Sequence, residues 1–119
     1  MPSTVQPVVV TRDLARLQAF YSSLLGAAEV GRVPDDGAPF FVQLQVGNSE
    51  LGLVSNTGAA ATAGRVLLSI EVDSVDALLP RVAALGGQVT GGPTDMPWGQ
   101  RVLHIADPDG NPVNLTQPL

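Results

Sequence analysis

The stretch DLARLQAFYSSLLG, residues 13–26, decides the fold that this sequence predicts. Its apolar residues recur every three or four positions, which is typical of an amphipathic helix that packs on one side. Asp13 is a residue type that caps helix N-termini, and Gly26 is suited to the left-handed conformation that ends many helices. We therefore expect a helix from 14 to 25 with both ends fixed by the sequence.

Extended segments surround this helix. A β-branched run at 5–10 precedes it, and apolar segments separated by turn-forming residues follow it at 28–33, 40–46 and 50–54. Apolar and polar residues alternate in the middle segment, so one face of that strand packs and the other faces solvent or a cavity. The first half of the chain therefore predicts the order βαβββ.

The second half repeats this order. A stretch of small residues at 56–64 has the composition of a linker and separates the two halves. A second helix is expected between the cap Ser74 and the glycines at 86–87, with a kink at Pro80 or a start later than the cap. Strands are expected at 66–72, 88–90, 101–106 and 112–117.

The predicted fold class is α+β, with two tandem βαβββ modules at about 5–55 and 65–118 in a single domain covering 1–119. Each module is expected to form a curved antiparallel sheet with its helix on the convex side. The concave face is then left open, which is a suitable shape for a small-molecule pocket.

Composition narrows the class of protein. Hydrophobic residues make up 45% of the 119 residues and charged residues 14%, which is enough apolar material for a folded core. The net charge is −5 and the basic residues are scattered, which argues against a nucleic-acid surface. Cysteine is absent, so disulfides and thiolate chemistry are excluded. With no secretory signal or membrane-length apolar run, we expect a cytoplasmic protein that does not contact a membrane.

Three stretches occur in a specific order: residues 7–14, the helix end at 20–26, and Asp-Pro-Asp-Gly-Asn-Pro-Val at 107–113. Together they resemble the glyoxalase, bleomycin-resistance and extradiol dioxygenase superfamily, also called the vicinal oxygen chelate superfamily. The resemblance covers nearly the whole chain and implies the paired βαβββ modules. By itself, Asp-Pro-Asp-Gly is what a tight turn requires, with Asp107 accepting from its own backbone, so we interpret it as structural.

The resemblance also implies a divalent metal ion held by one His, Glu or Gln from each of four strands. Those positions fall at Gln6, Gly52, Leu67 and Asn114 in this sequence. Gln6 can serve as a ligand, but glycine and leucine offer no donor and a neutral amide is a poor one. The only histidine, His104, falls outside the four positions. We therefore predict no bound metal and no other cofactor.

Superfamily members without the ion resemble the bleomycin-resistance type, which binds and sequesters a drug. The stretch at 97–101, Pro-Trp-Gly-Gln-Arg, is similar to a Trp-Gly segment of that branch. We predict a metal-free protein that binds an antibiotic or natural product, aromatic or cationic, in a concave pocket and confers resistance by sequestration. Strand parity and this segment give the candidate ligand-binding residues Phe41, Gln43, Gln45, Ser69, Glu71, Trp98, His104 and Asn114. The competing interpretation is a solvated sheet face, with the tryptophan as a loop anchor.

Two enzymatic alternatives stay open beside binding. One is a metal-independent lyase or isomerase in which Glu71 and His104 act as acid and base if they share a cavity. The other is a metal-dependent enzyme, such as a dioxygenase, with Glu50, Glu71 and His104 as ligands, because a two-residue slip preserves the strand face. We also expect a homodimer, since family members of this size commonly pair and the linker around Ala60 is compatible with module exchange.

Overall fold

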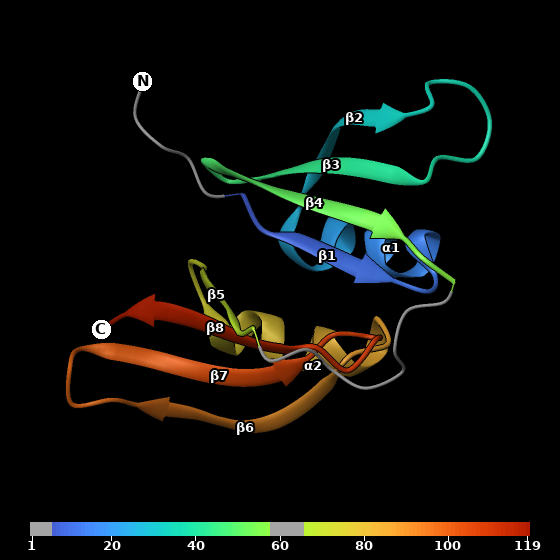
Figure 1. The fold of residues 1–119 in the computed structure, drawn as a ribbon. Helices are drawn as coiled ribbons and strands as arrows, with labels where there is room; N and C mark the ends of the chain where they lie inside the picture. The colour runs from blue at the N-terminus through green and yellow to red at the C-terminus, as the bar shows by residue number, and fades with distance from the viewer. Residues whose placement is uncertain (1–5, 58–65) are drawn as a thin grey trace. The chain divides into compact units, whose positions relative to one another are not determined.

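The computed structural model describes residues 6–57 and 66–119, and the chain divides into two compact units, Met1–Ala59 and Ala60–Leu119. We call these units module 1 and module 2. Each contains four strands and one helix in the order βαβββ (Figure 1). The predicted α+β class and the tandem modules are confirmed. Most of the predicted linker at 56–64 lies outside the described residues.

The elements of each module follow the predicted order. Module 1 consists of β1 (Val8–Thr11), α1 (Leu14–Leu25), β2 (Ala28–Val33), β3 (Phe41–Val46) and β4 (Ser49–Ser55). Module 2 consists of β5 (Leu68–Glu71), α2 (Val75–Ala84), β6 (Gln88–Asp95), β7 (Gln100–Ala106) and β8 (Pro112–Pro118). The largest departure from the prediction is β6, which was expected to end at Thr90 and extends to Asp95.

The two sheets have equivalent strand orders, β1-β4-β3-β2 and β5-β8-β7-β6. The hairpin strands pair antiparallel, but β1 pairs with β4 in parallel, and β5 pairs with β8 in the same way. The prediction of wholly antiparallel sheets is therefore wrong at one pairing in each module. The helical crossover lets the second strand run in the direction of the first, and two hairpin reversals then bring the fourth strand parallel to the first.

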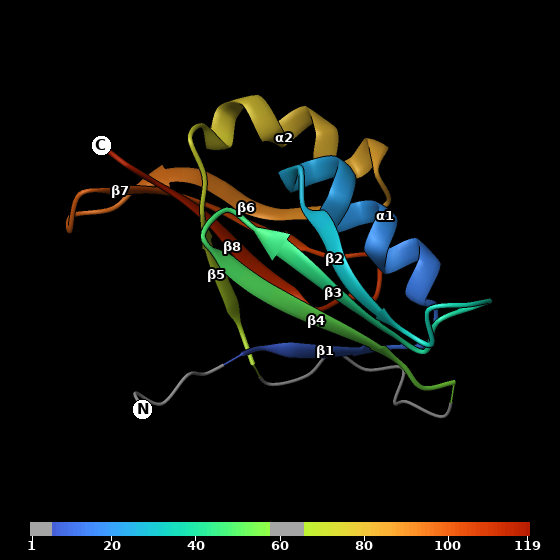
Figure 2. The same ribbon diagram turned by 90° about the horizontal axis from the view of Figure 1, so that it is seen from above.

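Helix α1 covers one face of the module 1 sheet, and its ends are as predicted (Figure 2). The Asp13 carboxylate accepts a hydrogen bond from the Arg16 backbone N–H at 3.1 Å, and Gly26 takes a φ of 67°. The buried residues of the helix are Leu14, Leu17, Phe20, Tyr21 and Leu24. They form the core of this module with Val42, Leu44, Leu51 and Leu53 of β3 and β4.

Helix α2 buries less of its surface. The Ser74 hydroxyl caps it by accepting from the Ala77 backbone N–H at 3.1 Å, as the sequence predicts. Only Val75 and Val82 of its residues are buried. The helix begins directly after its cap and continues through Pro80, so the later start that the sequence allowed is wrong.

Polar contacts fix the start of α2 against its sheet. The Gln117 side-chain oxygen on β8 accepts from the Val75 backbone N–H at 2.7 Å. Arg101 on β7 donates to Asp76 at 2.6 Å and to Asp95 on β6 at 2.7 Å. These bonds satisfy a free amide of the first helical turn and tie α2 to β6, β7 and β8, which are four elements of the module.

The turn between β7 and β8 is structural, as predicted. The buried Asp107 carboxylate accepts from the backbone N–H groups of Asp109 and Asn111 at 2.9 and 3.0 Å. The Gly110 N–H donates to the Asp107 carbonyl at 2.8 Å, and Gly110 has a φ of 83°. No helix in the described ranges is long and apolar enough to cross a membrane.

Candidate functional site

Each sheet turns one face toward its helix and leaves the other uncovered by it. We call the second surface open face 1 in module 1 and open face 2 in module 2. Open face 1 comprises Val8, Val10, Val33, Phe41, Gln43, Gln45, Glu50, Gly52 and Val54. Open face 2 comprises Ser69, Glu71, Gly91, Val102, His104, Asn114 and Thr116. Apart from Trp98, the predicted binding residues lie on these faces, as strand parity required.

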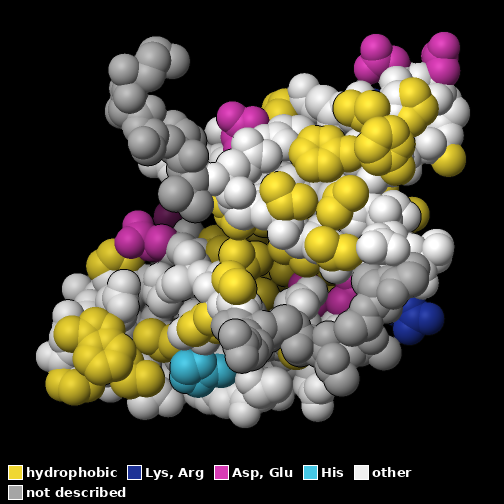
Figure 3. All heavy atoms as spheres, viewed as in Figure 1, with side chains coloured by type: hydrophobic (Ala, Val, Ile, Leu, Met, Phe, Trp, Pro, Cys, Tyr) yellow, Lys and Arg dark blue, Asp and Glu magenta, His cyan; other side chains and the backbone are white. Residues whose placement is uncertain are grey.

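An apolar row crosses open face 1. Val10, Val54, Phe41 and Val33 are paired in register across all four strands. Val10 and Val33 are about half exposed. The space-filling view shows hydrophobic side chains gathered over β2, β3 and β4 (Figure 3). This row offers an apolar surface to the face of a planar molecule.

The Phe41 ring lies over Gly52. A Cβ atom placed on Gly52 would be 3.1 Å from two ring carbons of Phe41 and 3.2 Å from a methyl group of Val8. These separations are tighter than ordinary van der Waals contact, so the ring occupies space that a side chain at residue 52 would need. Glycine here therefore lets the aromatic ring lie against the sheet.

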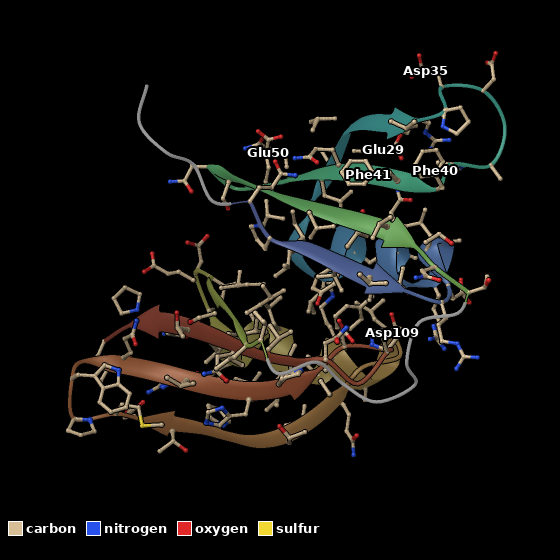
Figure 4. The ribbon with its side chains drawn as sticks, viewed as in Figure 1. Glu29, Asp35, Phe40, Phe41, Glu50 and Asp109 are labelled. Atoms are coloured by element: carbon tan, nitrogen blue, oxygen red, sulfur yellow. The ribbon has the colours of Figure 1, made fainter. Side chains whose placement is uncertain are left out.

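A line of polar side chains crosses the other end of open face 1. Gln6 donates to the Gln43 side-chain oxygen at 2.8 Å, and Gln43 donates to Glu50 at 2.8 Å. Figure 4 shows Glu50 and Phe41 over separate parts of the sheet. Gln45 instead donates to the carbonyl of Gly47 at 2.8 Å, within its own hairpin. Open face 1 thus has an apolar part and an amide-carboxylate part.

Open face 2 brings together a histidine and an amide. The Nδ1 atom of His104 lies 2.7 Å from the Oδ1 atom of Asn114, and the contact is partly buried. Ser69 on β5 pairs with Asn114 in register, and Gly91 on β6 pairs with His104. The row therefore runs across four strands, with two hydrogen-bonding side chains in contact at its centre.

Glu71 is displaced from this row. It pairs with Thr116, whose other partner is Val102, so it belongs to the adjacent row of open face 2. Within residues 6–57 and 66–119 no hydrogen bond is found between Glu71 and His104. The acid–base pair considered from the sequence stays a hypothesis.

Trp98 lies in the turn between β6 and β7. Its side chain is 67% exposed, and its indole N–H donates to the Gln100 side-chain oxygen at 2.9 Å. The Gly99 N–H closes the turn by donating to the Met96 carbonyl at 3.0 Å. His104 lies four positions after Gln100, about 13 Å along an extended strand. The tryptophan is therefore at the end of the sheet, away from the histidine.

The four positions at which the family resemblance suggests metal ligands do not form a suitable set. Gln6 is used in the amide line, and Gly52 lies under a phenyl ring. Leu67 is aliphatic, and the Asn114 oxygen is bonded to an imidazole. A divalent transition metal requires several imidazole, carboxylate or thiolate donors, which these residues do not supply.

The alternative set of Glu50, Glu71 and His104 draws on both modules and also stays a hypothesis. Within either module, the described part contains no group of three His, Asp or Glu side chains arranged to hold an ion.

Charge pairing on the helix side of module 1 centres on a carboxylate. Glu29 on β2 accepts from Arg32 at 2.7 and 2.8 Å and from Gln18 of α1 at 2.7 Å. The hydrogen bonds from Arg32 and Gln18 lower the pKa of Glu29 to about 2. The cluster ties the edge strand to the helix.

The equivalent cluster of module 2 centres on a guanidinium. Hydrogen bonds from Arg101 lower the pKa of Asp95, and the two carboxylates around Arg101 raise its own pKa. Arg101 pairs in register with Gln117, which bonds the helix, so it is on the helix side of the sheet. The open faces, by contrast, carry the carboxylates of Glu50 and Glu71.

Sequence reasoning missed two glycines that shape the site. Gly91 was expected just after a short strand, but it lies inside β6 at a shift of the pairing register. A glycine pair within an extended run is a signal of a bulge and could have indicated this. Gly52 was considered only as a missing ligand, whereas its lack of a side chain makes room for Phe41.

Comparison with known proteins identifies the family. The family model described as the Glyoxalase/Bleomycin resistance protein/Dioxygenase superfamily matches residues 4–115. An uncharacterised protein of Mycobacterium bovis is 30% identical over 126 residues, which cover 97% of this chain and 83% of that protein.

Two solved structures share the fold at lower identity. A bleomycin resistance determinant encoded on the transposon Tn5 has a TM-score of 0.73 and 23% identity, with 98% of each chain covered. The fosfomycin resistance protein FosX of Listeria monocytogenes, solved as a mutant with Mn(II) and 1S,2S-dihydroxypropylphosphonic acid, has a TM-score of 0.81 and 15% identity, covering 100% of this chain and 94% of that one. With the family match extending over almost the whole sequence and the βαβββ modules in agreement, this chain belongs to the glyoxalase/bleomycin resistance protein/dioxygenase superfamily.

Proposed function

We propose that the protein binds a small molecule, an antibiotic or another natural product, without a metal ion and confers resistance by sequestering it. The main support for this proposal comes from two positions at which the family resemblance suggests metal ligands. Gly52 lies under the Phe41 ring, and Asn114 is bonded to His104. The open faces then offer apolar surface and hydrogen-bonding groups in place of a Lewis acid. Two solved structures of the same fold are named as resistance proteins, one of them solved with Mn(II), which supports the resistance part of this proposal.

The proposed ligand is aromatic or cationic. The Phe41 ring and the neighbouring valines provide a surface for stacking, and the carboxylates on both open faces favour positive charge. The proposed binding residues are Phe41 for stacking, Gln43, Gln45, Ser69, His104 and Asn114 for hydrogen bonds, Glu71 for a cationic group, and Trp98 at the end of the sheet.

A metal-independent lyase or isomerase is the second candidate. The observation that favours it is the hydrogen bond between His104 Nδ1 and Asn114. In the neutral ring, the other nitrogen is then available to accept a proton. A base held in this way could remove a proton from a bound substrate. Consumption of the bound compound separates this candidate from sequestration.

We further propose that the protein is a single-domain homodimer in the cytoplasm. Two-fold homodimers are the commonest soluble homo-oligomers, and pairing of this kind would complete a pocket. Sedimentation equilibrium tests the oligomeric state. A dimer mass is expected, and a monomer mass would contradict a pocket shared between two chains.

The binding proposal is tested by calorimetric titration against a panel of polycyclic and glycopeptide antibiotics, with mass spectrometry of the recovered compound. Saturable binding with the compound unchanged is expected. Phe41→Leu should weaken binding of an aromatic compound by about fivefold, because stacking contributes on the order of 1 kcal/mol. Phe40→Leu is the matched control, since Phe40 is exposed and precedes the strand. Equal effects of the two substitutions, or conversion of the compound, would contradict sequestration on open face 1.

A further inference from the structure

We propose that His104 and Asn114 form a hydrogen-bond acceptor site on open face 2. Asn114 fixes which imidazole nitrogen carries the hydrogen, and the other nitrogen accepts from the O–H or N–H group of a small molecule. The site deepens the proposed function and rests on it for the existence of a natural ligand. Its first element, the position of the proton on the imidazole ring, is independent of that function.

The hydrogen bond assigns the proton. The partner of His104 Nδ1 is the carbonyl oxygen of Asn114 at 2.7 Å, and a carbonyl oxygen can only accept. Nδ1 therefore carries a hydrogen, and in the neutral ring Nε2 has the free lone pair. Asn114 acts as a positioning residue that selects one tautomer of the histidine.

The neighbouring strands orient the ring. Nδ1 points toward β8, where Asn114 lies. On the other side, a Cβ atom placed on Gly91 of β6 would be 3.5 Å from Cδ2 of His104. With Nδ1 and Cδ2 turned toward the flanking strands, the remaining ring atoms, Cε1 and Nε2, project away from the sheet. The accepting nitrogen is thus presented on open face 2.

Gly91 keeps this nitrogen uncovered. A Cβ at this position meets Cδ2, the ring carbon bonded to Nε2, at an ordinary contact distance. A longer side chain would extend over the ring edge. The backbone of Gly91 is outside the left-handed region, unlike that of Gly92 at 84°, so other residues can be introduced at 91 without backbone strain.

The rest of the row defines the ligand class. Among the described residues no acceptor is found for the side-chain N–H groups of Asn114, and Ser69 lies beside it in register. The row therefore offers an acceptor at His104 and donors beside it. A ligand with a hydroxyl or N–H group next to a carbonyl oxygen is complementary to this pattern.

Nitrogen NMR of the whole protein, labelled at histidine, tests the first element. The chain has one histidine, so the ring gives a single pair of nitrogen signals. At alkaline pH, with the ring neutral, the hydrogen is expected on Nδ1. Asn114→Ala should shift the population toward the Nε2–H form, whereas Asn114→Asp, which still accepts, should retain Nδ1–H. A free protein in the Nε2–H form would overturn the inference and leave the proposed function untouched.

Phenol and anisole test the acceptor role, because they share the aromatic ring and only phenol has a donor. Phenol should move the Nε2 signal and anisole should not. Gly91→Leu should abolish the phenol effect with the Nδ1–H form preserved, and Gly91→Ala should keep it. A Nδ1–H ring that phenol does not perturb would overturn the acceptor site. Failure of every antibiotic in calorimetry, with the phenol effect present, would instead contradict only the proposed function.

Discussion

Modules 1 and 2 have the same strand order and the same parallel pairing of first and last strands, yet they fill equivalent positions with different chemistry. The central row of open face 1 reads Val8, Gly52, Gln43, Gly31, and that of open face 2 reads Ser69, Asn114, His104, Gly91. On the fourth strand, glycine admits a phenyl ring in one module, and asparagine orients an imidazole in the other. The two modules thus share their topology, and the residue on the fourth strand gives each open face different neighbours.

The helices of the two modules also differ, in how many of their side chains are buried. Five side chains of α1 are buried, whereas two side chains of α2 are. The start of α2 is instead fixed by Gln117 and Arg101. Module 1 is therefore expected to depend more on apolar packing of its helix, and module 2 more on hydrogen bonds.

The largest expected effect tests that difference in packing. Leu17→Ala in α1 removes a fully buried side chain and should lower the free energy of unfolding by about 3 kcal/mol. Leu79→Ala in α2 removes a half-buried side chain and should cost about 1 kcal/mol. Urea denaturation followed by circular dichroism measures both. Equal losses would break the contrast between the two helices.

The two glycines of β6 give the next effect. Gly92 has a φ of 84°, and a Cβ there would lie 2.7 Å from the carbonyl oxygen of Val102. Gly92→Ala should therefore lower the free energy of unfolding by about 2 kcal/mol. Gly91→Ala is the matched control and should change it by less than about 0.5 kcal/mol. If Gly92→Ala leaves the free energy of unfolding unchanged, the left-handed backbone at Gly92 and the close approach of the Val102 oxygen would be contradicted.

A smaller effect is expected at Gly52 on open face 1. Gly52→Ala brings a methyl group against the Phe41 ring and should lower the free energy of unfolding by about 1 kcal/mol. In a Phe41→Ala background the same substitution should cost less, because the ring is gone and only the Val8 methyl group stays close to the new Cβ. A double-mutant cycle in thermal unfolding measures this coupling. Additive effects would mean that the ring does not occupy the space above residue 52.

The smallest effect concerns the charged cluster of module 1. The pKa of Glu29 is lowered to about 2 from an ordinary value of 4.5, so its ionised form contributes stability above pH 4.5 that is lost as the pH falls toward 2. Because the group is exposed, the contribution is small. Glu29→Gln should flatten the acid dependence of unfolding in this range, and Arg32→Gln should act in the same way. An unchanged acid slope in Glu29→Gln would refute the pairing.

Local features of the fold could be predicted from the sequence because they depend on neighbouring residues. The caps Asp13 and Ser74, the stop at Gly26 and the Asp107 turn are each set within a few positions of the chain. Strand parity likewise placed Gln43 and the other face residues correctly. These patterns require no knowledge of which strands are neighbours.

Contacts between strands could not be predicted in this way. The pairing register determines that His104 lies beside Asn114, while Glu71 falls in the adjacent row. It also places Phe41 over Gly52 and sets Trp98 apart at a turn. Since a shift of register changes every such neighbour, side-chain contacts across a sheet depend on the whole module.

Metal dependence of ligand binding tests the central claim most directly. A compound that binds in the antibiotic panel would be titrated into protein stripped with a chelator, and again after addition of Mn²⁺, Ni²⁺ or Zn²⁺, with bound metal determined by mass spectrometry. We predict the same affinity in all preparations and no stoichiometric ion. Binding that appears only with one equivalent of bound metal would contradict the account, since it would require a ligand set other than Gln6, Gly52, Leu67 and Asn114.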